Sequence, residues 1–142
     1  MIVAHILNQK GRDVATITPD KTLGDVVSIL GNRKIGALVV AEADRKIIGI
    51  ISERDVVKVL ARAGAAALAE PVARHMTAKV IACGGDDTID TVMQEMTKGR
   101  FRHMPVEHEG RLNGIISIGD VVKFRLEQLA AESQALREYI NG

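Results

Sequence analysis

Two pairs of polar residues have the types and spacing needed to hold a sugar phosphate. The heptapeptide Gly-Ile-Ile-Ser-x-x-Asp occurs twice, and its serine and aspartate are Ser52 and Asp55 in one copy, Ser117 and Asp120 in the other. If a helix begins at each serine, its free N–H groups form an anion site, the hydroxyl can donate to a phosphate, and the carboxylate can accept two ribose hydroxyls. Plain helix capping, with serine as N-cap and aspartate in the first turn, fits the same spacing.

Other patterns that could carry chemistry are incomplete. The glycines of residues 31–36 have the spacing of a phosphate-binding loop, but alanine and leucine follow where lysine and serine or threonine are required. Ile115 stands where a nucleophile elbow around Ser117 needs glycine. The four histidines form no HxxxH or HxH pair, and the single cysteine, Cys83, excludes a disulfide framework and a cysteine-based zinc site. We therefore expect no metal site and no catalytic centre.

Length, charge and composition exclude several classes of protein. The 142 residues suffice for one compact unit with a hydrophobic core. With 19 basic and 18 acidic residues and only three aromatic rings, the chain lacks the signature of a DNA- or RNA-binding protein. The longest apolar run, residues 36–41, is far shorter than the roughly 20 residues that span a bilayer, and the first ten residues show no signal-peptide pattern. We therefore expect a cytoplasmic protein with no direct nucleic-acid or membrane partner.

An internal repeat organises the chain. Residues 49–58 and 114–123 are identical at eight of ten positions. The segments that lead into the two copies also match, since residues 3–7 resemble residues 72–76. Each copy alone is small enough to be marginally stable, so two copies packed on each other are expected. The predicted units are residues 1–65 and residues 66–142, each with its own lead-in helix.

Each copy has the same expected order of elements: strand, helix, strand, strand, helix. In the first copy, a strand over residues 14–17 is followed by a helix capped by Thr22 and Asp25, which have the spacing of a capping box. Apolar strands over residues 37–41 and 46–51 then precede a second helix. This alternation predicts a mixed α+β fold.

The last predicted helix continues past the second copy and carries an apolar seam. Its seam positions are spaced alternately four and three residues apart, and they are Val122, Leu126, Leu129, Ser133, Leu136 and Ile140. This is a heptad pattern with one polar position. Either the helix lies on its own domain, or it pairs with the same helix of a second copy.

The two copies together resemble a tandem pair of CBS domains, the cystathionine-β-synthase-type repeat, joined as one Bateman module. The resemblance covers essentially the whole chain and rests on the doubled Gly-Ile-Ile-Ser-x-x-Asp-Val-Val string, the apolar helix stripe, and the run from Arg102 to Val106. It implies an α+β fold in which two β-α-β-β-α repeats pack through their sheets with pseudo-twofold symmetry. It also implies two clefts, a homodimer of modules, and regulatory binding of AMP, ADP, ATP, NAD(H) or S-adenosylmethionine.

The resemblance further implies which residues hold the ligand. Asp55 and Asp120 would each bind the ribose of one cleft, while Ser52 and Ser117 would contact phosphate. Arg54 would contact phosphate as well, and a glycine replaces it in the second copy. The other expected ligand-binding residues lie in the lead-in segments and around the starts of the middle strands, and they are Lys10, Thr77, Ile35, Gly36, Ala37, Phe101, Arg102, His103, Met104 and Pro105.

These implications favour a non-catalytic sensor of energy or redox state, in which an adenosine nucleotide changes the packing of the module and an unidentified regulated protein responds. Two alternatives stay open. A structural or dimerisation adaptor would use the terminal helix, and an enzyme would hydrolyse the bound nucleotide. The enzyme alternative lacks support because no nucleophile is paired with an oriented base in the sequence.

Overall fold

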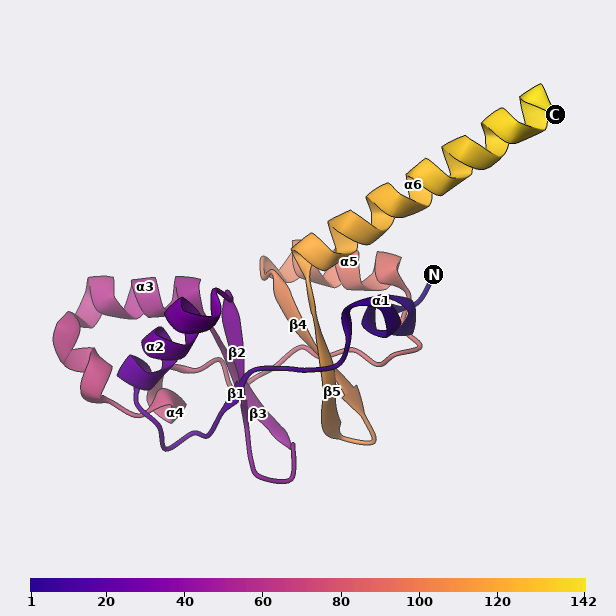
Figure 1. Ribbon diagram of the computed structural model, residues 1–142. Helices are drawn as coiled ribbons and strands as arrows, with labels where there is room; N and C mark the ends of the chain where they lie inside the picture. Colours follow the sequence, from indigo (N-terminus) through magenta and orange to yellow (C-terminus); the bar gives the residue numbers. More distant parts are fainter.

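The computed structural model describes residues 1–142 as two halves of similar build that lie side by side, with one long helix projecting from the second (Figure 1). The first half of the sequence contains α1 (Val3–Lys10), β1 (Thr16–Ile17), α2 (Leu23–Arg33), β2 (Ala37–Ala41), β3 (Ile47–Ser52) and α3 (Glu53–Ala63). The second half of the sequence contains η1 (Ala65–Ala69), α4 (Val72–His75), α5 (Ile89–Gly99), β4 (His103–His108), β5 (Arg111–Ser117) and α6 (Ile118–Asn141). None of these helices combines the length and the apolar character that crossing a membrane requires.

Capping boxes define the starts of the helices that matter for the site. The hydroxyl of Thr22 accepts a hydrogen bond from the N–H of Asp25, and the Asp25 carboxylate accepts one from the N–H of Thr22. The helices α3 and α6 begin in the same way at Ser52 and Ser117. Each such cap stabilises its helix by about 1 kcal/mol. The capping interpretation of the Ser-x-x-Asp spacing is confirmed, so a ligand role would be additional to it.

The two halves repeat the same hairpin, but only the first adds a further strand to it. β2 pairs antiparallel with β3, and β4 pairs antiparallel with β5. β1 joins β2 in parallel, and there the N–H of Val39 donates to the carbonyl of Ala15. Pro105 takes the place of Val39 in the second half and has no N–H to donate, so only a single bridge between Cys83 and Val106 forms. The predicted first strand of the second copy is wrong for this reason, and β1 is shorter than predicted.

The lead-in helices are exchanged between the halves. Val3 in α1 is fully buried in the core of the second repeat, although α1 precedes the first repeat in the chain. Val72 in α4 is fully buried in the core of the first repeat. The boundary between residues 65 and 66 stays a prediction. The core of each repeat includes a lead-in helix that lies across this boundary in the sequence. This exchange ties the two repeats together.

The exchange explains the glycine that opens both Gly-Ile-Ile-Ser strings. A Cβ atom added at Gly114 would lie 2.8 Å from a methyl carbon of Leu7 in α1. A Cβ atom added at Gly49 would overlap the side chain of Met76, which follows α4. Each glycine therefore leaves room for the lead-in segment of the other repeat, and its duplication reflects packing rather than ligand binding.

The repeats meet through their sheets. Val39, Ala41 and Leu112 form a small buried cluster between them. At the hairpin turns, the N–H of Leu112 donates to the carbonyl of Arg45 at 2.8 Å, and the Arg45 guanidinium donates to the carbonyl of Leu112 at 2.9 Å. The expected α+β fold, with two repeats packed through their sheets and an extended C-terminal helix, is confirmed.

Candidate functional site

Two clefts of similar size lie between the repeats, and each takes residues from both. The first, named the Asp55 cleft, lies between the start of α3, the segment after α4 and the segment entering β4, and its volume is about 590 Å³. The second, named the Asp120 cleft, lies between the start of α6 at Ser117, the segment after α1 and the segment entering β2, and its volume is about 570 Å³. Both volumes are typical of small-molecule sites, which measure about 300–1,000 Å³.

The Asp55 cleft brings together most of the expected ligand-binding residues. Ser52, Arg54 and Asp55 line it at the start of α3, and Thr77 lines it after α4. Two backbone hydrogen bonds with Ile50 in β3, of 3.0 and 2.9 Å, hold Thr77 in place. The residues that enter from the second repeat are Phe101, Arg102, His103 and Pro105. The serine–aspartate pair of one repeat thus faces the middle strand of the other.

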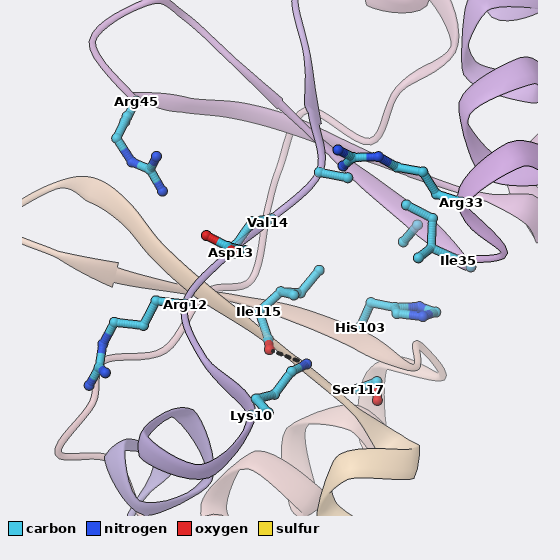
Figure 2. Close-up of a pocket in the computed structure, with 13 residues that line it drawn as sticks. Lys10, Arg12, Asp13, Val14, Arg33, Ile35, Arg45, His103, Ile115 and Ser117 are labelled. Carbon is cyan, nitrogen blue, oxygen red and sulfur yellow. Dashed lines mark hydrogen bonds between the residues drawn. The ribbon is translucent and has the colours of Figure 1, made fainter.

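The Asp120 cleft has the corresponding arrangement with the repeats reversed (Figure 2). Ile35, Gly36 and Ala37 line it at the entry to β2. Lys10 at the end of α1 and Ser117 at the start of α6 line it from the second repeat's side. The two clefts are related by the internal repeat, but their side chains differ.

Two of the expected ligand-binding residues line neither cleft. Asp120 only adjoins the second cleft, through its hydrogen bonds with the lining residues Lys10 and Ser117. The other residue is Met104. Its side chain is 1% exposed and belongs to the core of the second repeat. Side chains alternate between the two faces of a strand, so His103 and Pro105 reach the Asp55 cleft while Met104 points to the opposite face.

Cationic side chains outnumber anionic ones along both clefts. In the Asp55 cleft the acidic residues are Glu53 and Asp55, and the basic residues are Arg54, Lys58, Lys79, Arg100 and Arg102. In the Asp120 cleft the basic residues are Lys10, Arg12, Arg33 and Arg45, beside the acidic Asp13. The whole chain carries a net charge of only +1, so positive charge is concentrated here. Such a concentration attracts anionic ligands.

Several of these cations were missing from the sequence prediction. Lys58 follows Arg54 by one turn of α3, and this spacing is a signal that could have identified it. Arg33, at the end of α2, and Arg45, in a hairpin turn, have no such signal, because only the packing of the two repeats brings them to a cleft. Figure 2 shows Arg33 on the opposite side of the cleft from Lys10.

Each aspartate uses one carboxylate oxygen for capping. Oδ2 of Asp55 accepts from the N–H of Ser52 at 2.9 Å and from its hydroxyl at 3.0 Å. Oδ2 of Asp120 accepts from the N–H of Ser117 at 2.9 Å. Neither Oδ1 atom has a hydrogen-bond partner within the chain. Each carboxylate can therefore accept a ligand hydroxyl without loss of the cap.

Lys10 makes the two aspartates unequal. Its ammonium group donates to Oδ2 of Asp120 at 2.6 Å and to the carbonyl of Ile115 at 3.0 Å. Burial raises the pKa of Asp120, but the hydrogen bonds from Lys10 and Ser117 outweigh burial and hold that pKa below its usual range. Asp55 forms no ion pair. The charge of Asp120 is therefore already paired within the chain, whereas the charge of Asp55 is not.

His103 lies between the clefts and lines both of them. A Cβ atom added at Gly36 would lie 3.0 Å from the imidazole and 3.7 Å from Oε1 of Glu53, so the ring packs where only glycine leaves space. Burial lowers the pKa of His103, and the charges of Glu53 and Asp120 oppose this shift in part. Burial therefore favours the neutral imidazole, in which one ring nitrogen donates a hydrogen bond and the other accepts one.

Acidification is expected to destabilise the wild-type protein more than a His103→Gln variant. The unfolded histidine binds its proton near pH 6.5, whereas the folded one, whose pKa burial lowers, binds it at lower pH. The unfolded state thus holds more protons in this window, and the free energy of unfolding falls as the pH drops below about 6.5. Urea unfolding of both proteins at neutral pH and near pH 5.5 measures the difference. An equal loss of unfolding free energy in wild type and in His103→Gln would contradict a buried, neutral imidazole.

Comparison with known proteins agrees with the internal repeat. The model of the CBS domain family matches residues 4–62 and 72–127, which correspond to the two copies. The chain belongs to the CBS domain family. CBS pairs are typically regulatory modules, and the two matched segments make this chain one such pair.

Solved CBS structures share this arrangement over most of the chain. A CBS-domain protein from Agrobacterium tumefaciens is 51% identical, with a TM-score of 0.85 over 88% of this chain and 99% of that one. A protein with CBS domains from Burkholderia ambifaria, described in terms of signal transduction, is 37% identical, with a TM-score of 0.84 over 89% and 95%. The CBS pair of protein MJ0100, in complex with 5′-methylthioadenosine and S-adenosyl-L-methionine, is 24% identical, with a TM-score of 0.80 over 90% and 98%. That last likeness shows the fold alone.

Proposed function

We propose that this CBS pair is a non-catalytic regulatory module that binds an adenosine nucleotide, such as AMP, ADP, ATP or NAD(H), and so senses energy or redox state. One observation carries the proposal. A capped Ser-x-x-Asp helix start occurs twice, and each occurrence adjoins a cationic cleft of nucleotide size. The MJ0100 complex supports the ligand class, because both of its ligands contain adenosine.

The Asp55 cleft offers a partner for each part of the nucleotide. Oδ1 of Asp55 would accept the ribose hydroxyls, and such charge-assisted hydrogen bonds contribute about 1.5–3 kcal/mol each. The Ser52 hydroxyl and the Arg54 guanidinium would contact phosphate. Ile50 and Phe101 supply apolar surface for the adenine. Micromolar affinity requires about −8 kcal/mol, which this set can supply.

Binding would act on the packing of the repeats. The Asp55 cleft combines Ser52 and Asp55 of one repeat with the entry to β4 of the other, and the Asp120 cleft combines Ser117 with the entry to β2. A ligand in either cleft would therefore bridge both repeats. A nucleotide phosphate would also relieve the repulsion among the basic side chains around it. A ligand with different affinities for two packing states shifts their populations, and the unidentified regulated protein would respond to that shift.

The proposal extends to the setting in which the module works. We place it in the cytoplasm, as a homodimer without direct nucleic-acid or membrane contacts. The near-neutral net charge supports this placement, and so does the single cysteine. Burial raises the pKa of the Cys83 thiol to about 12, which keeps it unreactive.

Calorimetric titration of the full chain with AMP, ATP and NADH tests the proposal. We expect at least one of them to bind with a dissociation constant in the micromolar range, roughly −8 kcal/mol. We also expect ATP to stay intact during incubation. Absence of binding by all three would contradict the proposal, and phosphate release that His103→Ala abolishes would support an enzyme instead.

A structural adaptor is the second candidate function, because α6 projects far beyond the body of the module (Figure 1). An adaptor alone would dimerise but bind no nucleotide. Light scattering together with the calorimetric titration distinguishes it from a nucleotide-binding module.

A further inference from the structure

The C-terminal part of α6 carries an apolar stripe that nothing in the chain covers. Phe124 is the last buried residue of the helix, which continues for roughly 25 Å beyond it. Residues 131–142 are all exposed. The helix leaves the body of the module and projects into solvent (Figure 1). The interpretation that this helix lies on its own domain is therefore wrong beyond Phe124.

The exposed stripe is the heptad seam seen in the sequence. Its apolar members are between 48% and 70% exposed, and they are Val122, Leu126, Leu129, Leu136 and Ile140. An isolated helix gains little from such a stripe, whereas a second helix of the same kind would bury it by knobs-into-holes packing. Leucine occupies two of the three d positions, 129 and 136, as two-stranded coiled coils prefer, and Val122 occupies the third.

The base of the helix is anchored, which points the seam away from the body. Arg125 forms an ion pair with Asp90 in α5, on the side of α6 that faces its own repeat. Val121 and Phe124 are buried on that side as well. The seam therefore starts from a fixed orientation and is available to another molecule.

The charges beside the seam specify how two such helices would pair. In a parallel, in-register pair, Glu132 at position g lies opposite Arg137 at position e of the other helix, and symmetry makes this ion pair twice. In the antiparallel pair that overlaps the whole seam, Glu132 would face Glu132 and Lys123 would face Arg137. Like charges oppose the second arrangement, and opposite charges favour the first.

We propose that α6 beyond Phe124 is a self-association element that forms a parallel two-stranded coiled coil with α6 of a second copy of this chain. Ser133 lies at a central a position, where it meets its own counterpart across the seam. One polar residue among five apolar ones sets the register at the expense of stability. This proposal goes beyond nucleotide binding and does not depend on it.

Cysteine cross-linking of the full chain tests both the pairing and its direction. Ser133→Cys hardly changes the size of the side chain and places a thiol at the expected self-contact. Ala131→Cys is the matched control, because it places a thiol on the face opposite the seam. The native Cys83 is buried in both proteins. Under mild oxidation, Ser133→Cys is expected to form disulfide-linked dimers at least about tenfold faster than Ala131→Cys.

A second substitution shows whether the seam is responsible. Adding Leu129→Asp to Ser133→Cys should reduce cross-linking to the rate of the Ala131→Cys control, since a charge at a seam position disfavours burial. Adding Ala131→Asp to Ser133→Cys should leave it unchanged. Equal rates for Ser133→Cys and Ala131→Cys would overturn the proposal. Cross-linking only between a Leu129→Cys chain and a Ser133→Cys chain would indicate an antiparallel pair, and this result would also overturn the proposed parallel coiled coil.

Discussion

Asp55→Asn is expected to weaken nucleotide binding in the Asp55 cleft by about 10- to 100-fold, which equals about 1.5–3 kcal/mol of charge-assisted hydrogen bonding. Asparagine keeps the size of the side chain and an oxygen that can accept from the N–H of Ser52, so α3 stays capped. The charge that strengthens the hydrogen bonds to the ribose is lost. Calorimetry with the tightest-binding adenosine nucleotide measures the change.

Two controls separate the ribose contact from a general disturbance of the fold. Asp120→Asn should leave binding in the Asp55 cleft unchanged, because that carboxylate adjoins the other cleft. A 2′,3′-dideoxy analogue of the nucleotide should bind wild type as weakly as the natural ligand binds Asp55→Asn. The affinity of the analogue should fall little further in Asp55→Asn than in wild type, since the two changes remove the same interaction. Additive losses would contradict a contact between Asp55 and the ribose.

Gly114→Val is expected to destabilise the fold by about 2–3 kcal/mol. A Cβ atom at this position lies 2.8 Å from Leu7, which is 1% exposed and has little room to move. Overpacking would push α1 away from β5 and open the core of the second repeat. Chemical denaturation measures the loss as a lower midpoint.

Gly31→Ala is the matched glycine substitution. Gly31 lies in the last turns of α2, and a Cβ atom there meets nothing within 4 Å. Alanine should stabilise the helix by about 0.5–1 kcal/mol, because glycine is the poorer helix former. Destabilisation of similar size by Gly31→Ala and Gly114→Val would show that the close approach of α1 is not the cause.

Local patterns in the sequence predicted most of what is local in the structure. The capping box at Thr22 and the N-cap at Ser52 could be predicted, because serine or threonine followed at three residues by aspartate has a direct physical meaning. The hairpins and helices follow from hydrophobic periodicity. The ends of the strands were less accurate, because Pro105 removes one ladder hydrogen bond and that effect depends on its partner strand.

The long-range arrangement could not be predicted from those patterns. Nothing local shows that α1 packs on the second repeat, or that Gly49 and Gly114 exist to admit Met76 and Leu7. That each cleft takes residues from both repeats is equally a long-range effect, because the packing of the sheets decides which segment of the second repeat faces Asp55. The ion pair between Lys10 and Asp120 joins residues that are far apart in the chain.

The scarcity of aromatic residues gains meaning from the clefts. The chain has only two phenylalanines and one tyrosine, and Phe101 lines the Asp55 cleft where Ile35 lines the Asp120 cleft. Lys10 is paired with Asp120, whereas Asp55 has no cation partner. The two clefts are therefore unequal in shape and in charge, and we expect the Asp55 cleft to bind nucleotide more tightly.

Native mass spectrometry of the full chain with increasing AMP tests the central claim most directly. Two unequal clefts predict a first AMP bound at low concentration and a second at higher concentration. Asp55→Asn should shift the first binding event to higher AMP concentration, and Asp120→Asn the second. A chain that binds no adenosine nucleotide, or one whose two bound nucleotides are unaffected by either substitution, would contradict the account.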